Sequence, residues 1–206
     1  MPTKTKSTSK TYHHGDLRTA LIEAAMRLVA EDGMDKLSLR AVAKQINVSS
    51  AAPYHHFKDK LSLLGAVVEV GLTQFNYKLR HAAACAASPQ EQLRDLGAAY
   101  VVFAAENPNL FDLIQKPEFA GDDVSPQVAR ERRKNHEILL KTISACMPNA
   151  SEAQLRTSCA AAWGLVHGIA VLAIDNRLNA VMPYEDLGTA TTTLIEQINL
   201  AKALGV

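Results

Sequence analysis

Cysteine is scarce in this chain of 206 residues, which holds only Cys85, Cys146 and Cys159. An odd number of widely spaced cysteines excludes a disulfide framework and predicts a protein of the reducing cytoplasm. None of the three has a basic sequence neighbour that would activate its thiol, which argues against the alternative of a redox switch.

Aromatic residues make up 5% of the chain, and β-branched runs are short, whereas alanine is abundant. This composition predicts an all-α fold. We find no apolar run that approaches the roughly 18 residues of a membrane span. The N-terminus, MPTKTKSTSK, also lacks the apolar core of a signal peptide. A soluble protein with no membrane partner is therefore predicted.

Sequence signals of catalysis and of metal binding are missing too. There is no Cys-x-x-Cys pair, no Gly-rich phosphate loop and no Ser/His/Asp constellation. His13-His14 and His55-His56 are adjacent pairs, so their rings point to different helix faces and do not chelate one metal. We predict a protein that is not an enzyme and that uses no cofactor or metal. The basic run at 130–134 is interpreted as an exposed helix face.

The net charge is only +1, but it is unevenly distributed. Residues 1–60 hold ten Lys and Arg against six Asp and Glu, a net of +4, and the remainder holds twelve against fifteen, a net of −3. Because the local field decides whether phosphate is attracted, this division favours a nucleic-acid partner for the first part.

The segment 38–60, SLRAVAKQINVSSAAPYHHFKDK, is the most informative in the chain. Ser38 is a hydroxyl cap, and the apolar residues after it repeat at the spacing of one buried helix face: Leu39, Val42, Ala43 and Ile46. Asn47 accepts a left-handed backbone, which allows a tight turn. Pro53 is tolerated only in a first helical turn, so a second helix is predicted to begin near Ser49 or Ser50.

Two short helices at a steep angle form a helix-turn-helix, which fits the major groove of DNA. The small residues at 49–52 let the backbone approach a phosphate. Tyr54, His55, Lys58 and Lys60 add hydrogen-bond donors on the neighbouring turns. The alternative is a structural helical hairpin that never meets DNA.

Capping residues and helix breakers organise the chain. Residues 1–11 are predicted to be a flexible basic tail, 12–62 a three-helix helix-turn-helix domain, and 63–206 a C-terminal helical domain. About nine helices are predicted, at 16–32, 38–46, from 49 or 50, at 59–86, from Ser88-Pro89, from Asn107-Pro108, from Ser125-Pro126, at 151–177 and at 184–204.

The motif LSLRAVAKQINVSSAAPYHHFKDKLSLL resembles the DNA-binding signature of the TetR family of bacterial regulators. YHHGDLRTALIEAAMRLVAEDG, at 12–33, resembles the first helix of that family. AAWGLVHGIAVL and ENPNLFDLI resemble a C-terminal subgroup with a Trp-x-x-x-His-Gly core. Asn47 stands where the family commonly has Gly, and Asn can hold the same backbone.

The resemblance implies a DNA-binding unit and an effector-binding unit. Phosphate contacts are expected from Ser38, Tyr54, His55 and Lys60, and base contacts from Arg40, Ser50 and Ala51. Ser49 is expected to lie at the DNA as well. The ligand pocket is expected to involve Trp163 and His167 with apolar walls at Tyr100, Phe103, Phe111 and Met147. The alternative places Trp163 in the core and His167 in a buried hydrogen bond.

A homodimer is also implied, with tail helices of two subunits packed as a four-helix bundle. Gly164 and Gly168 would then form a strip where the partner's helix comes close, although tight packing within one subunit is the alternative. Two copies could read both halves of a palindromic operator. We predict a cytoplasmic, nucleoid-associated repressor that a small-molecule effector releases from DNA. The alternative is an all-helical small-molecule-binding protein or enzyme.

Overall fold

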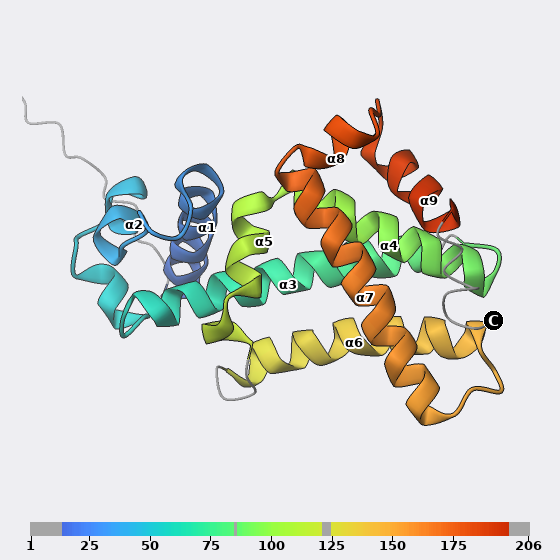
Figure 1. Cartoon of the computed structure of the whole chain (residues 1–206). Coiled ribbons are helices and arrows are strands. Elements are labelled where there is room, and N and C mark those ends of the chain that lie inside the picture. The colour runs from blue at the N-terminus through green and yellow to red at the C-terminus, as the bar shows by residue number, and fades with distance from the viewer. Residues whose placement is uncertain (1–13, 85, 121–124, 198–206) are drawn as a thin grey trace, which may run out of the picture. The chain divides into compact units, whose positions relative to one another are not determined.

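The structure, a computed structural model, describes residues 14–84, 86–120 and 125–197. The predicted basic tail lies outside these residues. The described residues form nine α-helices and two short 3₁₀-helices with no strand, which confirms the all-α prediction (Figure 1). The chain divides into two compact units, Met1–Val67 (unit 1) and Val68–Val206 (unit 2).

Unit 1 holds α1 (His14–Asp32), α2 (Leu39–Gln45), the 3₁₀-helix η1 (Ala52–His55) and the first turns of α3 (Lys60–Ala84). The Ser38 hydroxyl caps α2 by accepting from the Ala41 N–H at 3.1 Å. Asn47 has a φ of 56°, so the left-handed turn predicted after α2 is confirmed. The face predicted to be buried is buried at Leu39, Val42 and Ala43 and half-buried at Ile46.

The second helix of the motif differs from the prediction. It is not an α-helix from Ser49 or Ser50 but a turn that leads into η1. Pro53 has no N–H, so the Ser49 carbonyl accepts instead from the Ala52 N–H, at 3.0 Å. The Tyr54 N–H likewise bonds the Ala51 carbonyl, three residues back. The proline thus selects 3₁₀ geometry, whereas its placement in a first helical turn had predicted a helix from Ser49 or Ser50.

Unit 2 contains the rest of α3 and six further α-helices. They are α4 (Pro89–Glu106), α5 (Pro108–Gln115), α6 (Pro126–Cys146), α7 (Glu152–Ile174), α8 (Arg177–Val181) and α9 (Leu187–Gln197), with the 3₁₀-helix η2 (Pro117–Phe119) after α5. The hydroxyls of Ser88, Ser125 and Ser151 each accept from an N–H in the first turn of the following helix. The helix starts predicted at 88, 107, 125 and 151 are confirmed.

The end of α7 comes earlier than the predicted Arg177. Asn176 adopts a left-handed φ of 55°, which stops α7 at Ile174 and begins the unpredicted helix α8. Asp186 accepts from the Thr189 N–H at 2.7 Å, so α9 begins at Leu187 rather than at Tyr184. The predicted continuation to 204 lies outside the described residues.

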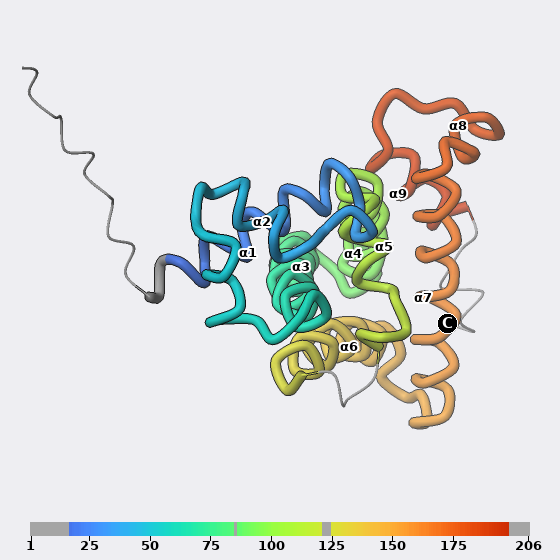
Figure 2. The backbone as a smooth tube through the Cα atoms, turned by 90° about the vertical axis from the view of Figure 1, so that its left-hand side faces the viewer, coloured from blue at the N-terminus to red at the C-terminus, as the bar shows by residue number. Residues whose placement is uncertain are grey.

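Helix α4 is central in unit 2 and packs against α5, α6, α7 and α9 (Figure 2). At Gly97 a Cβ atom would come within 2.6 Å of Ile195 Cδ1 and 3.1 Å of Val166 Cγ1. This glycine therefore permits the close approach of α9 and α7 to α4.

Helix α7 is the one described helix whose length and composition would let it cross a membrane, contrary to the prediction that no run was long enough. Its side chains instead pack against other helices of unit 2. Cys159, Ala162, Ile169 and Ala170 are buried, and α7 packs against α4, α6 and α8. It is a core helix of unit 2, although much of its apolar stretch is not buried.

Candidate functional site

The residues predicted to contact DNA lie on the surface of unit 1. Seven are exposed: Ser38, Arg40, Ser49, Ser50, Ala51, Tyr54 and His55. Lys60 is half-buried, and its ammonium donates to the Asp35 carbonyl at 3.2 Å. The Lys60 ammonium has three donors, so two can still reach an acceptor outside the protein.

Beneath this surface the second half of the motif is anchored by buried residues. Pro53 is buried and Phe57 is 3% exposed, whereas Tyr54 between them is 54% exposed. The Arg18 guanidinium lies 5.5 Å from the centroid of the Phe57 ring. Small and polar side chains therefore project from a fixed apolar base, which is the arrangement that groove recognition requires.

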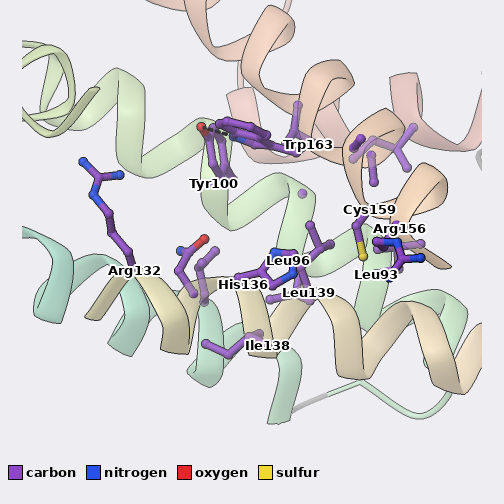
Figure 3. A pocket seen from close by; sticks show the side chains of 17 residues that line it. Leu93, Leu96, Tyr100, Arg132, His136, Ile138, Leu139, Arg156, Cys159 and Trp163 are labelled. Atoms are coloured by element: carbon purple, nitrogen blue, oxygen red, sulfur yellow. Dashed lines mark hydrogen bonds between the residues drawn. The ribbon is translucent and has the colours of Figure 1, made fainter. Parts of the chain in front are cut away.

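Unit 2 contains a cavity of about 510 Å³ (Figure 3). Its lining is mostly apolar and comes from α3, α4, α6, α7 and α9. The lining residues are Leu79, Leu93, Leu96, Gly97, Tyr100, Arg132, Asn135, His136, Ile138, Leu139, Arg156, Cys159, Ala160, Ala162, Trp163, Val166 and Ile195. A cavity of this size can enclose a small organic molecule.

Tyr100 and Trp163, both predicted ligand contacts, lie together on one wall of this cavity (Figure 3). The Trp163 indole N–H donates to the Tyr100 hydroxyl at 3.4 Å, and that hydroxyl lies 3.0 Å from His167 Nδ1. Burial raises the pKa of Tyr100 to about 12, although the bond from Trp163 opposes the rise. Trp163 is 54% exposed and is not a core residue. His167 is half-buried and lies outside the cavity lining, and its bond to Tyr100 is only partly buried.

Three other predicted pocket residues lie in the core, outside the cavity lining. Phe103 is 2% exposed, and its ring centroid is 4.8 Å from that of Phe75. Phe111 is 3% exposed and packs edge-on to Tyr100, with 5.6 Å between the ring centroids. Met147 is not itself a lining residue, but it belongs to an apolar cluster of residues from α4, α6, α7 and α9 that includes cavity-lining residues. Apolar character predicted their burial, but it could not show which buried residues face a cavity.

The polar wall on α6 was not predicted from the sequence, and the basic run at 130–134 is only partly the exposed face that was expected. The Arg132 guanidinium is half-buried and donates to the carbonyls of Ile114 and Phe119, the latter at 2.8 Å. Burial lowers the pKa of Arg132. Arg156 lies at the other end of the cavity, with an exposed side chain that pairs with Glu152 (Figure 3).

Glu131 is also buried, at 9% exposure, on the side of α6 that faces α3. Its Oε1 lies 2.5 Å from the Lys134 ammonium. The fully buried Asn76 on α3 donates to the Glu131 carbonyl at 2.8 Å and to Oε2 at 3.1 Å. Burial opposes ionisation, but the bonds from Lys134 and Asn76 and the charges of Lys134 and Arg80 prevail and lower the pKa of the Glu131 carboxyl.

A pH dependence of stability follows from this lowered pKa. The Glu131 carboxylate stabilises the fold above the ordinary carboxyl pKa of 4.5, and this contribution disappears as the pH falls through the lower pKa of the folded state. Glu131→Gln is expected to be less stable at pH 7 by about 1–3 kcal/mol. Urea unfolding at several pH values should show that the difference narrows below pH 4.5. A constant difference down to pH 3 would contradict the assignment.

Gly164 and Gly168 are exposed on α7, and a Cβ atom at either position would meet nothing within 4 Å. Close packing within the described residues of one subunit therefore does not require glycine at these positions.

Two parts of the chain match known families. Residues 21–67 match the family described as "Bacterial regulatory proteins, tetR family". Residues 93–197 match "Tetracyclin repressor-like, C-terminal domain". The first match contains the helix-turn-helix, and the second contains most of the cavity lining. The Trp-x-x-x-His-Gly subgroup named from the sequence is not distinguished by these matches.

The chain is also similar to individual known proteins. The chain is 41% identical to Tetracycline repressor protein class C of Escherichia coli over 56 residues, which span 27% of this chain and 26% of that protein. A solved Rhodococcus sp. RHA1 protein of unknown function is 26% identical, with a TM-score of 0.77 over 92% of this chain and 96% of its own.

Two further structures of similar fold were solved as complexes with ligands. FadR of Bacillus subtilis, in complex with stearoyl-CoA, is 17% identical, with a TM-score of 0.65 over 86% of this chain and 95% of its own. AibR, in complex with isovaleryl coenzyme A and operator DNA, is 18% identical, with a TM-score of 0.58 over 81% and 98%. At these identities the likeness shows the fold alone.

Proposed function

Since the chain belongs to the TetR family of DNA-binding transcriptional regulators, we propose that it is a repressor that leaves its operator when a small molecule occupies the cavity of unit 2. Members of this family are not enzymes, so the enzymatic alternative falls away. The observation that carries the proposal is the pairing of an exposed helix-turn-helix in one unit with an apolar cavity of about 510 Å³ in the other.

The DNA contacts divide into two groups. We assign phosphate contacts to Ser38, Ser49, Tyr54, His55 and Lys60, and base-edge contacts to Arg40, Ser50 and Ala51. Pro53 and the alanine before it carry no hydrogen-bonding side chain, so contacts with thymine methyl groups and DNA shape add to the recognition.

A homodimer is proposed to read a palindromic operator through two copies of this motif. Helix α7 supports it, because Gly164, Gly168 and Val171 follow one another along one exposed face of this mostly apolar helix. Burying such a face against a second copy removes apolar surface from water. The unpaired buried thiols of Cys146 and Cys159 fit a cytoplasmic protein acting on the nucleoid.

The effector is proposed to be a mainly apolar molecule with a polar or anionic group. The lining includes two arginines and a histidine but no carboxylate. Because FadR and AibR were solved with acyl-CoA molecules, acyl compounds are the first class to test. To release DNA about 100-fold, the effector must favour the releasing state by roughly 2.7 kcal/mol.

The chain's single tryptophan provides a direct probe of this cavity. Titration with isovaleryl-CoA or stearoyl-CoA is expected to change the fluorescence of Trp163, because an occupant alters the polarity around a half-exposed indole on the cavity wall. The control variant Trp163→Phe/Val181→Trp moves the indole to a site that is 87% exposed and outside the lining. An equal change in this control would show that the ligands do not act in the cavity.

The experiment that tests the function as a whole is the salt dependence of DNA binding. A regulator that neutralises 6–10 phosphates loses affinity by about 10³–10⁵ between 50 and 200 mM salt. A small-molecule-binding protein with a structural hairpin would show no salt-dependent affinity for DNA at all.

A further inference from the structure

The Tyr100 hydroxyl is the meeting point of two polar groups of α7. Trp163 and His167 lie one turn apart on this helix, and Tyr100 comes from α4. The Trp163 indole N–H donates to the hydroxyl oxygen at 3.4 Å, and His167 Nδ1 lies 3.0 Å from the same oxygen. Tyr100 and Trp163 line the cavity, whereas His167 lies outside the lining (Figure 3). An occupant of the cavity therefore contacts a tyrosine whose hydroxyl is bonded to α7.

Aromatic packing fixes the ring that carries this hydroxyl. Tyr100 is 6% exposed, and the rings of Phe75 and Phe111 pack edge-on against it, with centroid separations of 5.2 and 5.6 Å. The His167 ring centroid lies 5.7 Å from that of Phe111. Because packing holds the ring on several sides, its hydroxyl is presented in one place, as the recognition of a polar ligand group requires.

Two arrangements of protons satisfy these three polar groups. The Trp163 N–H can only donate, so it occupies one lone pair of the Tyr100 oxygen. When the His167 proton is on Nε2, Nδ1 accepts the tyrosine proton, and a lone pair of the hydroxyl oxygen is left for a donor. When the proton is on Nδ1, this nitrogen donates to the oxygen, and the tyrosine proton is left for an acceptor. The tautomer of His167 thus decides whether the hydroxyl accepts from an occupant or donates to it.

The chemistry of the cavity favours the arrangement in which Tyr100 donates. Its lining includes Arg132 and Arg156, and no carboxylate is among the lining residues that the structure describes, so acceptor oxygens suit it better than a cationic donor. Burial raises the pKa of Tyr100 to about 12, so the hydroxyl keeps its proton at neutral pH. A carbonyl oxygen accepts a hydrogen bond without bringing a charge into a mostly apolar lining.

From this arrangement we propose that the Tyr100 hydroxyl recognises a carbonyl oxygen of the effector by donating a hydrogen bond to it. His167 is a positioning residue, because its Nδ1–H tautomer holds the hydroxyl oxygen and frees the tyrosine proton for the carbonyl. The inference rests on the proposed function, since it takes the cavity as the effector site. It narrows the effector to an apolar molecule with a carbonyl group, which belongs either to a thioester or to a free carbonyl compound.

The test measures the affinity of the full-length protein for methyl pentyl ketone and for the alkene in which a methylene group replaces its carbonyl oxygen. Tyr100→Phe is expected to lower the affinity for the ketone about tenfold, and the affinity for the alkene should change less than about twofold. Titration of the fluorescence of Trp163, the chain's single tryptophan, gives both values. The matched control Thr142→Val removes a buried hydroxyl that bonds Gln92 outside the lining, and it should change neither affinity.

The tautomer of His167 is the second measurement, because a histidine with a merely structural role would keep its tautomer. Nitrogen-15 NMR of the imidazole is expected to show the proton on Nε2 in the unliganded protein and on Nδ1 in the ketone complex. The alkene should not produce this switch in the wild type, and the ketone should not produce it in Tyr100→Phe.

Isovaleryl-CoA, whose carbonyl belongs to a thioester, distinguishes the two sources of the group. A tenfold loss in Tyr100→Phe for this compound alone would assign the carbonyl to a thioester, and a loss for the ketone alone would assign it to a free carbonyl compound. The proposal would be overturned if no loss were specific to a carbonyl compound, if the His167 proton stayed on Nε2 in every complex, or if the wild type bound none of the compounds. The salt dependence of DNA binding would still decide the proposed function separately.

Discussion

Replacing Arg40 by glutamate is expected to weaken binding to the operator by at least about 100-fold at about 150 mM salt. Arg40 is exposed in the first turn of α2, at the predicted base contacts. The substitution removes a donor to base edges and places a negative charge against DNA. A carboxylate in the first turn of a helix is favourable for the helix dipole, so the fold should survive.

Arg177→Glu is the matched control for this prediction. It changes the net charge by the same amount on exposed α8 of unit 2. Fluorescence anisotropy with an operator fragment and with a random fragment would measure both variants. If Arg177→Glu weakened binding as much as Arg40→Glu, a general charge effect would explain the loss. The assignment of DNA base contacts to Arg40 would then be wrong.

Phe103→Ala is expected to cost about 3–5 kcal/mol of unfolding free energy, the usual range for a truncated core phenylalanine. The Phe103 ring is 2% exposed and packs on Phe75. At about 2–4 °C per kcal/mol for a chain of this size, the melting temperature should fall by roughly 6–20 °C. Differential scanning calorimetry would measure the shift.

Trp163→Ala provides the contrast, because a larger side chain is removed from a half-exposed position on the cavity wall. Its cost should stay within about 1 kcal/mol. Phe103 and Trp163 were both predicted to line the pocket. The difference in unfolding free energy between the two variants tests whether Phe103 lies in the core and Trp163 on the cavity wall. A larger loss of unfolding free energy for Trp163→Ala than for Phe103→Ala would contradict this placement of the two residues.

Local chemistry made the helix starts predictable. A serine caps a helix by bonding an N–H only three residues later in the chain, and a proline or polar residues often follow it. Ser88, Ser125 and Ser151 could therefore be predicted as helix caps without knowledge of the tertiary structure. The left-handed turn at Asn47 is equally local. Pro53 predicted the start of a helix but not its 3₁₀ geometry, and the left-handed turn at Asn176 that ends α7 was not predicted.

The residues assigned to DNA contacts could be predicted from the sequence more completely than the residues that line the cavity. The residues assigned to DNA contacts lie on one short segment, and all of them except the half-buried Lys60 are exposed. The cavity wall is assembled from five helices, and Arg132 and Asn135 on α6 look like any charged or polar helix surface in the sequence. Spacing shows which residues share a face, but not whether that face meets water, a core or a cavity.

The most direct test of the central claim is the binding of purified protein to fragmented genomic DNA at about 150 mM salt, followed by sequencing of the retained fragments. A dimeric repressor is expected to retain a set of fragments that shares one palindrome, with half-sites about 10–10.5 base pairs apart or a multiple of that spacing. A retained set without a common sequence, from protein whose extract contains no bound small molecule, would contradict it.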